Sequence, residues 1–148
     1  MANSLENKVA LITGGSRGIG RAIALEFASR GAAVVVNYNK SPESAEEVVK
    51  QIQSAGGKAA AFQADVSDFK QAEALVKFAV DTFGDLSILV NNAGITRDQL
   101  IMMMPEADWD AVINTNLKST FNCSKAAVKH MMRKRVGRII NMASVAGH

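Results

Sequence analysis

The chain has 148 residues, 48% of them hydrophobic and 21% charged, which is the size and composition of one globular domain with a buried core. Its formal charge of +3 includes no long basic run, and the sequence lacks the aromatic platforms of nucleic-acid-binding surfaces. Without a recognisable signal peptide or membrane-spanning stretch, we expect a cytoplasmic protein with neither a nucleic acid nor a membrane as partner. We also expect a single domain, residues 1–148.

The first predicted strand, residues 9–12, leads into a glycine-rich turn that opens a helix. Gly14 permits a sharp turn, Gly18 lets the backbone approach a diphosphate, and Gly20 allows the helix to pack closely on the strand. The predicted cofactor-binding residues of this turn are Gly14, Ser16, Arg17, Gly18, Ile19 and Gly20. The rival phosphate loop of ATPases requires Lys and Ser or Thr where this chain has Arg21 and Ala22, so that chemistry is disfavoured.

The second predicted strand, residues 33–36, ends in a segment that bears on cofactor choice. An NAD site usually places a carboxylate here, whereas this chain has Asn37-Tyr38-Asn39-Lys40. Arg17 and Lys40 are cations that a 2′-phosphate attracts, and Asn37 can donate a hydrogen bond to it. This pattern favours NADP, and the less favoured alternative is that both cations are solvated surface charges.

Capping signals frame the next two helices. Ser41 is a predicted N-cap, Asp68 is another with Gln71 reaching back to it, and Gly31 and Gly56 follow helix ends.

Between the two predicted N-caps lies the third predicted strand, residues 59–62, and Asp65 and Val66 follow it. Asp65 could accept a hydrogen bond from an adenine amino group beside the apolar wall of Val66, or it could be a turn carboxylate. Both residues are candidate cofactor-binding positions.

The fourth predicted strand, residues 88–90, is followed by Asn91-Asn92-Ala93-Gly94 at the edge where α/β sheets open their ligand crevice. Asn92, Ala93 and Gly94 are therefore candidate cofactor-binding residues, although Asn and Gly also favour ordinary turns.

A long helical pattern comes next, with an apolar stripe that suits core packing. The stripe consists of Trp109, Val112, Ile113, Leu117, Phe121, Val128, Met131 and Met132. Asn116 also lies on this stripe, where a polar side chain needs hydrogen-bond partners. It either hydrogen-bonds to the backbone across a kink or orders a water near a site. Cys123 is interpreted as a small packed residue without a chemical role.

The fifth predicted strand, residues 139–142, precedes Ser144, whose hydroxyl could bind a substrate carbonyl. Apolar runs alternating with helices predict an α/β fold, a doubly wound, Rossmann-like parallel sheet truncated after its fifth strand. His130 and His148 have no partner at ligand spacing, so no metal site is expected.

These motifs, in this order, resemble those of the short-chain dehydrogenase/reductases. They are Thr13-Gly14-x-x-x-Gly18-x-Gly20, Asp65, Asn91-Asn92-Ala93-Gly94, Asn116 and Ser144. Residues 91–98 and 137–141 are similar to the bacterial 3-oxoacyl-acyl-carrier-protein reductases, which reduce 3-oxoacyl thioesters with NADPH in fatty acid biosynthesis. The chain departs from that subfamily near Met103, where an arginine is common, and this affects the expected acyl and carrier preference.

The resemblance implies catalytic roles for Ser144, which steadies the ketone oxygen, and Asn116, which holds a relay water. The proton donor would be a tyrosine whose pKa a lysine lowers. The only tyrosine here, Tyr38, has Pro42 four residues later, so no Tyr-x-x-x-Lys pair exists in these residues. We expect the N-terminal part of a longer reductase, inactive by itself, and the alternative is a non-catalytic nucleotide-binding or assembly subunit.

The resemblance also implies partners. A basic cluster late in the long helix could meet acyl carrier protein around Arg135, or it could simply be a solvated helix end. The family usually forms tetramers, so a homo-oligomer is expected, with the long helix at one interface.

Overall fold

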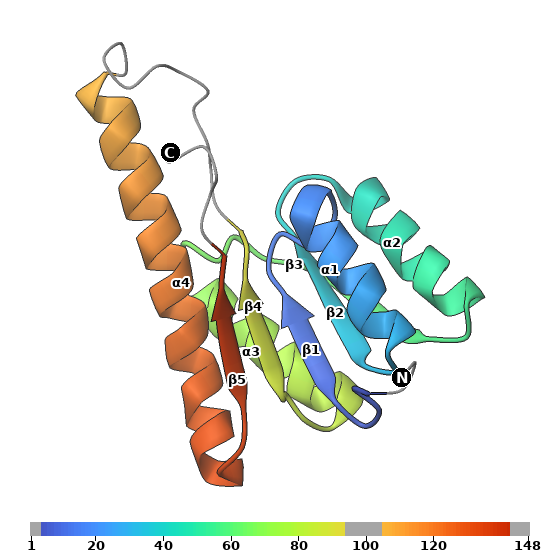
Figure 1. The fold of residues 1–148 in the computed structure, drawn as a ribbon. Helices are drawn as coiled ribbons and strands as arrows, with labels where there is room; N and C mark the ends of the chain where they lie inside the picture. Colours follow the sequence, from blue (N-terminus) through green and yellow to red (C-terminus); the bar gives the residue numbers. More distant parts are fainter. Residues whose placement is uncertain (1–3, 94–104, 143–148) are drawn as a thin grey trace.

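The computed structural model describes residues 4–93 and 105–142, which form a five-stranded parallel sheet in the order β3-β2-β1-β4-β5 (Figure 1). The strands are β1 (Val9–Ile12), β2 (Ala33–Tyr38), β3 (Lys58–Gln63), β4 (Ile88–Asn91) and β5 (Arg138–Asn141). From β1 the chain builds outward to β3 and then returns to β4 on the other side of β1. This reversal opens a crevice above the carboxyl ends of β1 and β4, where ligands of such sheets bind.

Strand register follows the sequence pattern closely. Leu11 pairs with Val35 on one side and with Leu89 on the other, and Leu89 pairs with Ile139. Each predicted strand is present, and the ends differ by no more than one or two residues, as where β2 continues to Tyr38. The predicted doubly wound α/β sheet is confirmed.

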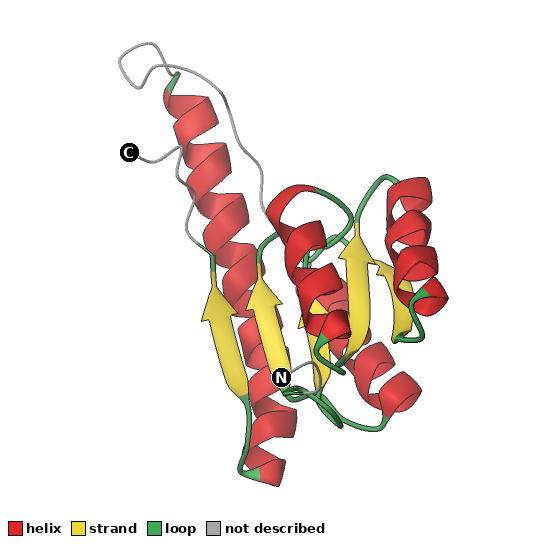
Figure 2. Ribbon diagram, turned by 45° about the vertical axis from the view of Figure 1, so that its right-hand side comes forward, coloured by secondary structure: helices red, strands yellow, loops and turns green. Residues whose placement is uncertain are grey.

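The helices cover the two faces of the sheet (Figure 2). On one face lie α1 (Gly18–Ser29) and α2 (Pro42–Ser54), and on the other lie α3 (Phe69–Phe83) and α4 (Glu106–Lys134). Neighbouring strand residues enter opposite cores: Ile12 and Val36 pack toward α1 and α2, whereas Leu11 and Val35 pack toward α3 and α4. Burial on both faces explains why these strands read as continuous apolar runs.

The predicted cap of α3 forms with one difference. Asp68 is the N-cap and its carboxylate accepts a hydrogen bond from the Gln71 backbone N–H at 3.2 Å. The Gln71 side chain reaches back further than expected, because its Oε1 accepts from the N–H of Asp65 at 2.8 Å rather than from Asp68. Ser41 is the N-cap of α2 as predicted, but its hydroxyl makes no capping hydrogen bond.

Most of the large side chains in the apolar stripe of α4 lie outside the core, with Met131 as an exception. Leu117, Phe121 and Met132 are 65%, 61% and 71% exposed. The buried residues of this helix are mostly small or polar: Ser119, Asn122, Cys123, Ala126, Ala127 and Met131. Small side chains let α4 approach α3 and the sheet closely, which turns the larger apolar residues outward. Of the described helices, α4 included, none is long and apolar enough to cross a membrane.

Candidate functional site

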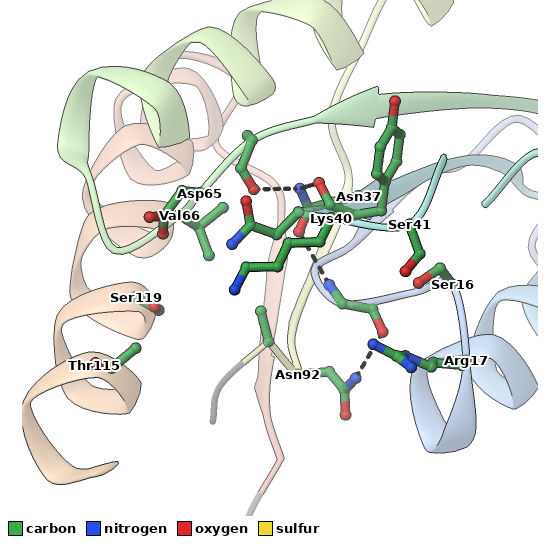
Figure 3. A pocket seen from close by; sticks show the side chains of 15 residues that line it. Ser16, Arg17, Asn37, Lys40, Ser41, Asp65, Val66, Asn92, Thr115 and Ser119 are labelled. Carbon is green, nitrogen blue, oxygen red and sulfur yellow. Dashed lines mark hydrogen bonds between the residues drawn. The ribbon is translucent and has the colours of Figure 1, made fainter. Parts of the chain in front are cut away.

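A cavity of about 380 Å³ lies at the carboxyl edge of the sheet, between the glycine-rich turn, the end of β2 and the middle of α4 (Figure 3). Eight predicted site residues line it: Gly14, Ser16, Arg17, Asn37, Asp65, Val66, Asn92 and Ala93. Gly18, Ile19 and Gly20 form the first turn of α1 beside it. Gly94 and Ser144 lie outside the described residues.

The glycine-rich turn has the backbone that its sequence predicts. Gly14 and Gly18 have φ angles of 62° and 60°, in the left-handed region that favours glycine. A side chain at Gly20 would collide with the carbonyl oxygen of Gly14 and with the side-chain Nδ2 of Asn92. The first turn of α1 therefore lies directly against the ends of β1 and β4, and its N-terminus faces the cavity.

Thr13 fastens this turn to the end of β4. Its hydroxyl oxygen accepts hydrogen bonds from the N–H groups of Asn92 and Ala93, both at 2.9 Å, and donates to the Val90 carbonyl at 3.3 Å. The Asn92 side chain completes the link by donating to the Gly14 carbonyl at 3.1 Å. Asn92 and Ala93 are thereby fixed at the rim of the cavity.

The structure gives Asn37 a different role from the one predicted. It lines the cavity, but its side chain is buried and bonded within the protein: Oδ1 accepts from the Gly14 N–H at 3.0 Å. Its amide nitrogen donates to the carbonyl of Ala64 at 3.1 Å, with Tyr38 and Phe62 also in range. This amide is already used inside the protein and is not available as a donor to a phosphate.

Two cations remain on the cavity wall. Arg17, from the glycine-rich turn, and Lys40, just past β2, are both exposed, and the Lys40 amino group extends into the middle of the cavity (Figure 3). Within the described residues neither of them takes part in an ion pair. Positive charge therefore lies next to a helix N-terminus in this part of the cavity, an arrangement that attracts anions.

Asp65 serves at least partly as a turn carboxylate. Its Oδ1 accepts from the Ser67 hydroxyl at 2.6 Å and from the Ser67 N–H at 3.0 Å. The neighbouring Val66 is buried, and its carbonyl accepts from the Asn122 amide at 3.0 Å, which ties this wall to α4.

The far wall of the cavity comes from α4 and was missed by the sequence analysis. Thr115 and Ser119, one helical turn apart, face the cavity across from Arg17 (Figure 3). The sequence does place these two hydroxyl residues four apart on one helix face, but it does not show that this face meets the cavity. Asn116 is partly buried next to Thr115.

A second polar link joins β4 and β5 below the cavity. Asn91 pairs in register with Asn141, and its amide nitrogen donates to Asn141 Oδ1 at 2.9 Å and to the Ser124 hydroxyl at 3.1 Å. Asn91 Oδ1 is buried and, among the described residues, has no hydrogen-bond partner.

Two groups outside the cavity have shifted pKa values. Burial raises the pKa of the Cys123 thiol to about 12, in keeping with a packing role. The hydrogen bond from His130, at 2.7 Å, holds the pKa of Asp85 below its ordinary value and links α4 to the loop before β4. Among the described residues no group of three or more potential metal ligands is found.

This fold and site define a class of protein. The chain belongs to the short chain dehydrogenase family, whose family model matches residues 8–148.

Two bacterial relatives with more specific names are similar to most of this chain. The chain is 54% identical over 140 residues to a Staphylococcus aureus protein named 3-oxoacyl-[acyl-carrier-protein] reductase FabG, covering 95% of this chain and 57% of that one. It is 49% identical over 144 residues to the 3-oxoacyl-[acyl-carrier-protein] reductase of a Synechocystis species, covering 97% and 58%. The chain thus spans less than three fifths of the length of these relatives.

Among solved structures, the chain is similar to a short chain dehydrogenase from Burkholderia cenocepacia in complex with NADP. The TM-score is 0.85 and the sequence identity 42%, covering 97% of this chain and 58% of that one.

Proposed function

We propose that the chain binds NADP(H) in this cavity, as the dinucleotide-binding part of a reductase of 3-oxoacyl thioesters carried by acyl carrier protein. The observation that carries the cofactor choice is the pair of cations, Arg17 and Lys40, on a wall where the end of β2 offers no carboxylate. The NADP complex of the Burkholderia relative and the names of the bacterial relatives support the proposal.

The residues present fit such a cofactor. Open space around Gly18 leaves the backbone at the start of α1 accessible to a diphosphate, and Arg17 and Lys40 are the proposed ligands of the 2′-phosphate. Asp65 and Val66 would border the adenine, and Asn92, Ala93 and Gly94 would border the nicotinamide ribose. The cofactor would supply the hydride.

For the reaction we propose that Ser144 orients the ketone oxygen and that Asn116 holds a relay water. A developing alkoxide needs a proton donor whose pKa is lowered by a nearby cation. Because the 148 residues contain no Tyr-x-x-x-Lys, we expect them to bind the dinucleotide without reducing ketones. Because these residues contain no Tyr-x-x-x-Lys, a non-catalytic nucleotide-binding subunit is the alternative.

The proposed partner surfaces lie on α4. Its last turn is basic, and Arg133, Lys134 and Arg135 are exposed, which suits an acidic carrier protein. The exposed Leu117, Phe121 and Met132 suit an interface between copies of the chain.

The cofactor proposal is tested by titrating the chain with NADPH and NADH and following nicotinamide fluorescence. We expect tighter binding of NADPH, and Arg17→Ala and Lys40→Ala should each weaken it about tenfold while leaving NADH unchanged. Lys50→Ala, which removes an exposed lysine of α2 outside the cavity wall, is the matched control. Equal affinity for the two dinucleotides, or none for either, would refute the proposal.

The reaction proposal needs a separate assay. NADPH oxidation with a short 3-oxoacyl thioester should be absent for the 148 residues and present for a version extended through a Tyr-x-x-x-Lys segment. Binding without turnover in both would favour the non-catalytic alternative.

A further inference from the structure

Asn37 connects three separate segments around the cavity. It stands one residue before the end of β2, the residue is 2% exposed, and its side-chain amide is hydrogen-bonded within the protein. Its Oδ1 accepts a hydrogen bond from the Gly14 N–H, and its backbone carbonyl accepts one from the Gly15 N–H at 3.0 Å. Its amide nitrogen donates to the carbonyl of Ala64.

Only one orientation of this amide satisfies its surroundings. The oxygen faces an N–H group, whereas the nitrogen faces the carbonyls of Tyr38, Phe62 and Ala64 at 3.1 to 3.4 Å. A flipped amide would set a donor against a donor and an oxygen against three oxygens. The position therefore requires an acceptor and a donor on one short planar group.

The segments that Asn37 joins line opposite ends of the cavity. Gly14 begins the turn that leads to the N-terminus of α1, and Ala64 immediately precedes Asp65 and Val66. Asn37 accepts hydrogen bonds from the N–H groups of both Gly14 and Gly15. An anion would therefore have to bind backbone N–H groups that come later in the turn.

We infer that Asn37 is a positioning residue: its side-chain amide fixes the glycine-rich turn and the end of β3 in one arrangement, so that the diphosphate and adenine ends of the cavity are set before a dinucleotide arrives. This inference rests on the proposed function and extends it, because Asn37 acts through Gly14 and Ala64 and makes no phosphate contact itself. Preorganisation of this kind increases affinity by removing an ordering cost from binding.

The decisive variant is Asn37→Asp. An ionised carboxylate keeps the acceptor for Gly14 but faces three carbonyl oxygens, so burial and repulsion raise its pKa above that of an ordinary carboxyl. The protonated acid has one O–H donor and one carbonyl acceptor, and it reproduces both bonds of the asparagine. Acid should therefore rescue this variant.

The matched control is Asn39→Asp. Asn39 lines the same cavity two residues further on, but it is exposed and makes no bond to the glycine-rich turn. Its carboxylate would repel a phosphate directly and would stay ionised in mild acid.

The measurement is the affinity for NADP⁺ by calorimetry at about pH 5 and about pH 8, with each variant divided by the wild type at the same pH. We expect Asn37→Asp to bind about tenfold more weakly at the higher pH and within about twofold of wild type at the lower. Asn39→Asp should stay weaker than wild type at both pH values, because its carboxylate remains ionised. A pH-independent loss in Asn37→Asp, or no loss at all, overturns the inference.

A second readout needs no ligand. Hydrogen exchange of the Gly14 N–H in the free chain should be slow in the wild type and at least about tenfold faster in Asn37→Leu, which has neither donor nor acceptor. If the wild type binds no dinucleotide, the proposed function fails while this exchange measurement still tests the inference. Unchanged Gly14 exchange in a folded Asn37→Leu chain overturns it.

Discussion

The cavity side and the α4–β5 side of the molecule differ in how fully their polar groups are hydrogen-bonded and their apolar side chains are buried. Around the cavity, buried polar groups such as Thr13 and Asn37 are bonded and the strands are covered on both faces. On the other side, α4 extends past the sheet, Phe121 and Ile140 are exposed, and Asn91 Oδ1 has no partner in the part of the chain that the structure describes (Figure 1). The cavity wall is thus well bonded within the described residues, whereas the outward faces of α4 and β5 expose large apolar side chains.

The sharpest test of this contrast is a pair of leucine truncations. Leu75 in α3 is fully buried, and Leu75→Ala should lower the free energy of unfolding by about 2–5 kcal/mol. Leu117→Ala on α4 removes an exposed side chain and should cost no more than about 0.5 kcal/mol. Urea denaturation at low protein concentration measures both, and similar losses would show that α4 buries Leu117 after all.

A smaller effect is expected at the glycine-rich turn. In Gly20→Ala the new Cβ meets the Gly14 carbonyl, so stability should fall by about 1–3 kcal/mol and NADP⁺ affinity by about a hundredfold. Gly56→Ala, at a positive φ after α2 with open space around it, should cost about 1 kcal/mol with no change in binding. If the two variants bind NADP⁺ equally well, close packing at Gly20 does not matter to the site.

The smallest expected effect concerns the Asp85–His130 pair that fastens α4. Asp85 has a lowered pKa in the folded chain, so its contribution is fully present above the ordinary carboxyl pKa of about 3.9 and is lost as the pH falls through the lower folded value. Because the Asp85 side chain is 37% exposed, the contribution is at most about 1 kcal/mol.

The measurement is the stability difference between wild type and Asp85→Asn, followed by urea denaturation from about pH 6 to about pH 2. The difference should shrink toward zero in acid. A difference that grows as the pH falls would contradict the assigned direction.

Local patterns were sufficient for much of this molecule. The strands, the glycine-rich turn and the cavity residues at strand ends follow from apolar runs and from the rule that parallel strands present their carboxyl ends at one edge. Long-range packing decided the rest. Nothing in the sequence tells which face of α4 meets the sheet, so core packing and an interface between copies both stayed open for its apolar stripe, and Thr115 and Ser119 were overlooked.

Asn37 shows the same limit at the scale of one side chain. Its place at the end of β2 was predictable, but its bonds to Gly14 and Ala64 depend on a turn and a strand that lie 23 and 27 residues away. A polar residue at a strand end reads equally well as a ligand contact or as an internal bond.

Dinucleotide binding is proposed to depend most on the region between the start of α1 and the end of β2. The decisive measurement is a crystal structure of the chain with saturating NADP⁺. We expect the diphosphate against the first turn of α1 and the 2′-phosphate between Arg17 and Lys40. A cavity that stays empty, or a 2′-phosphate bound away from both cations, would contradict this proposal.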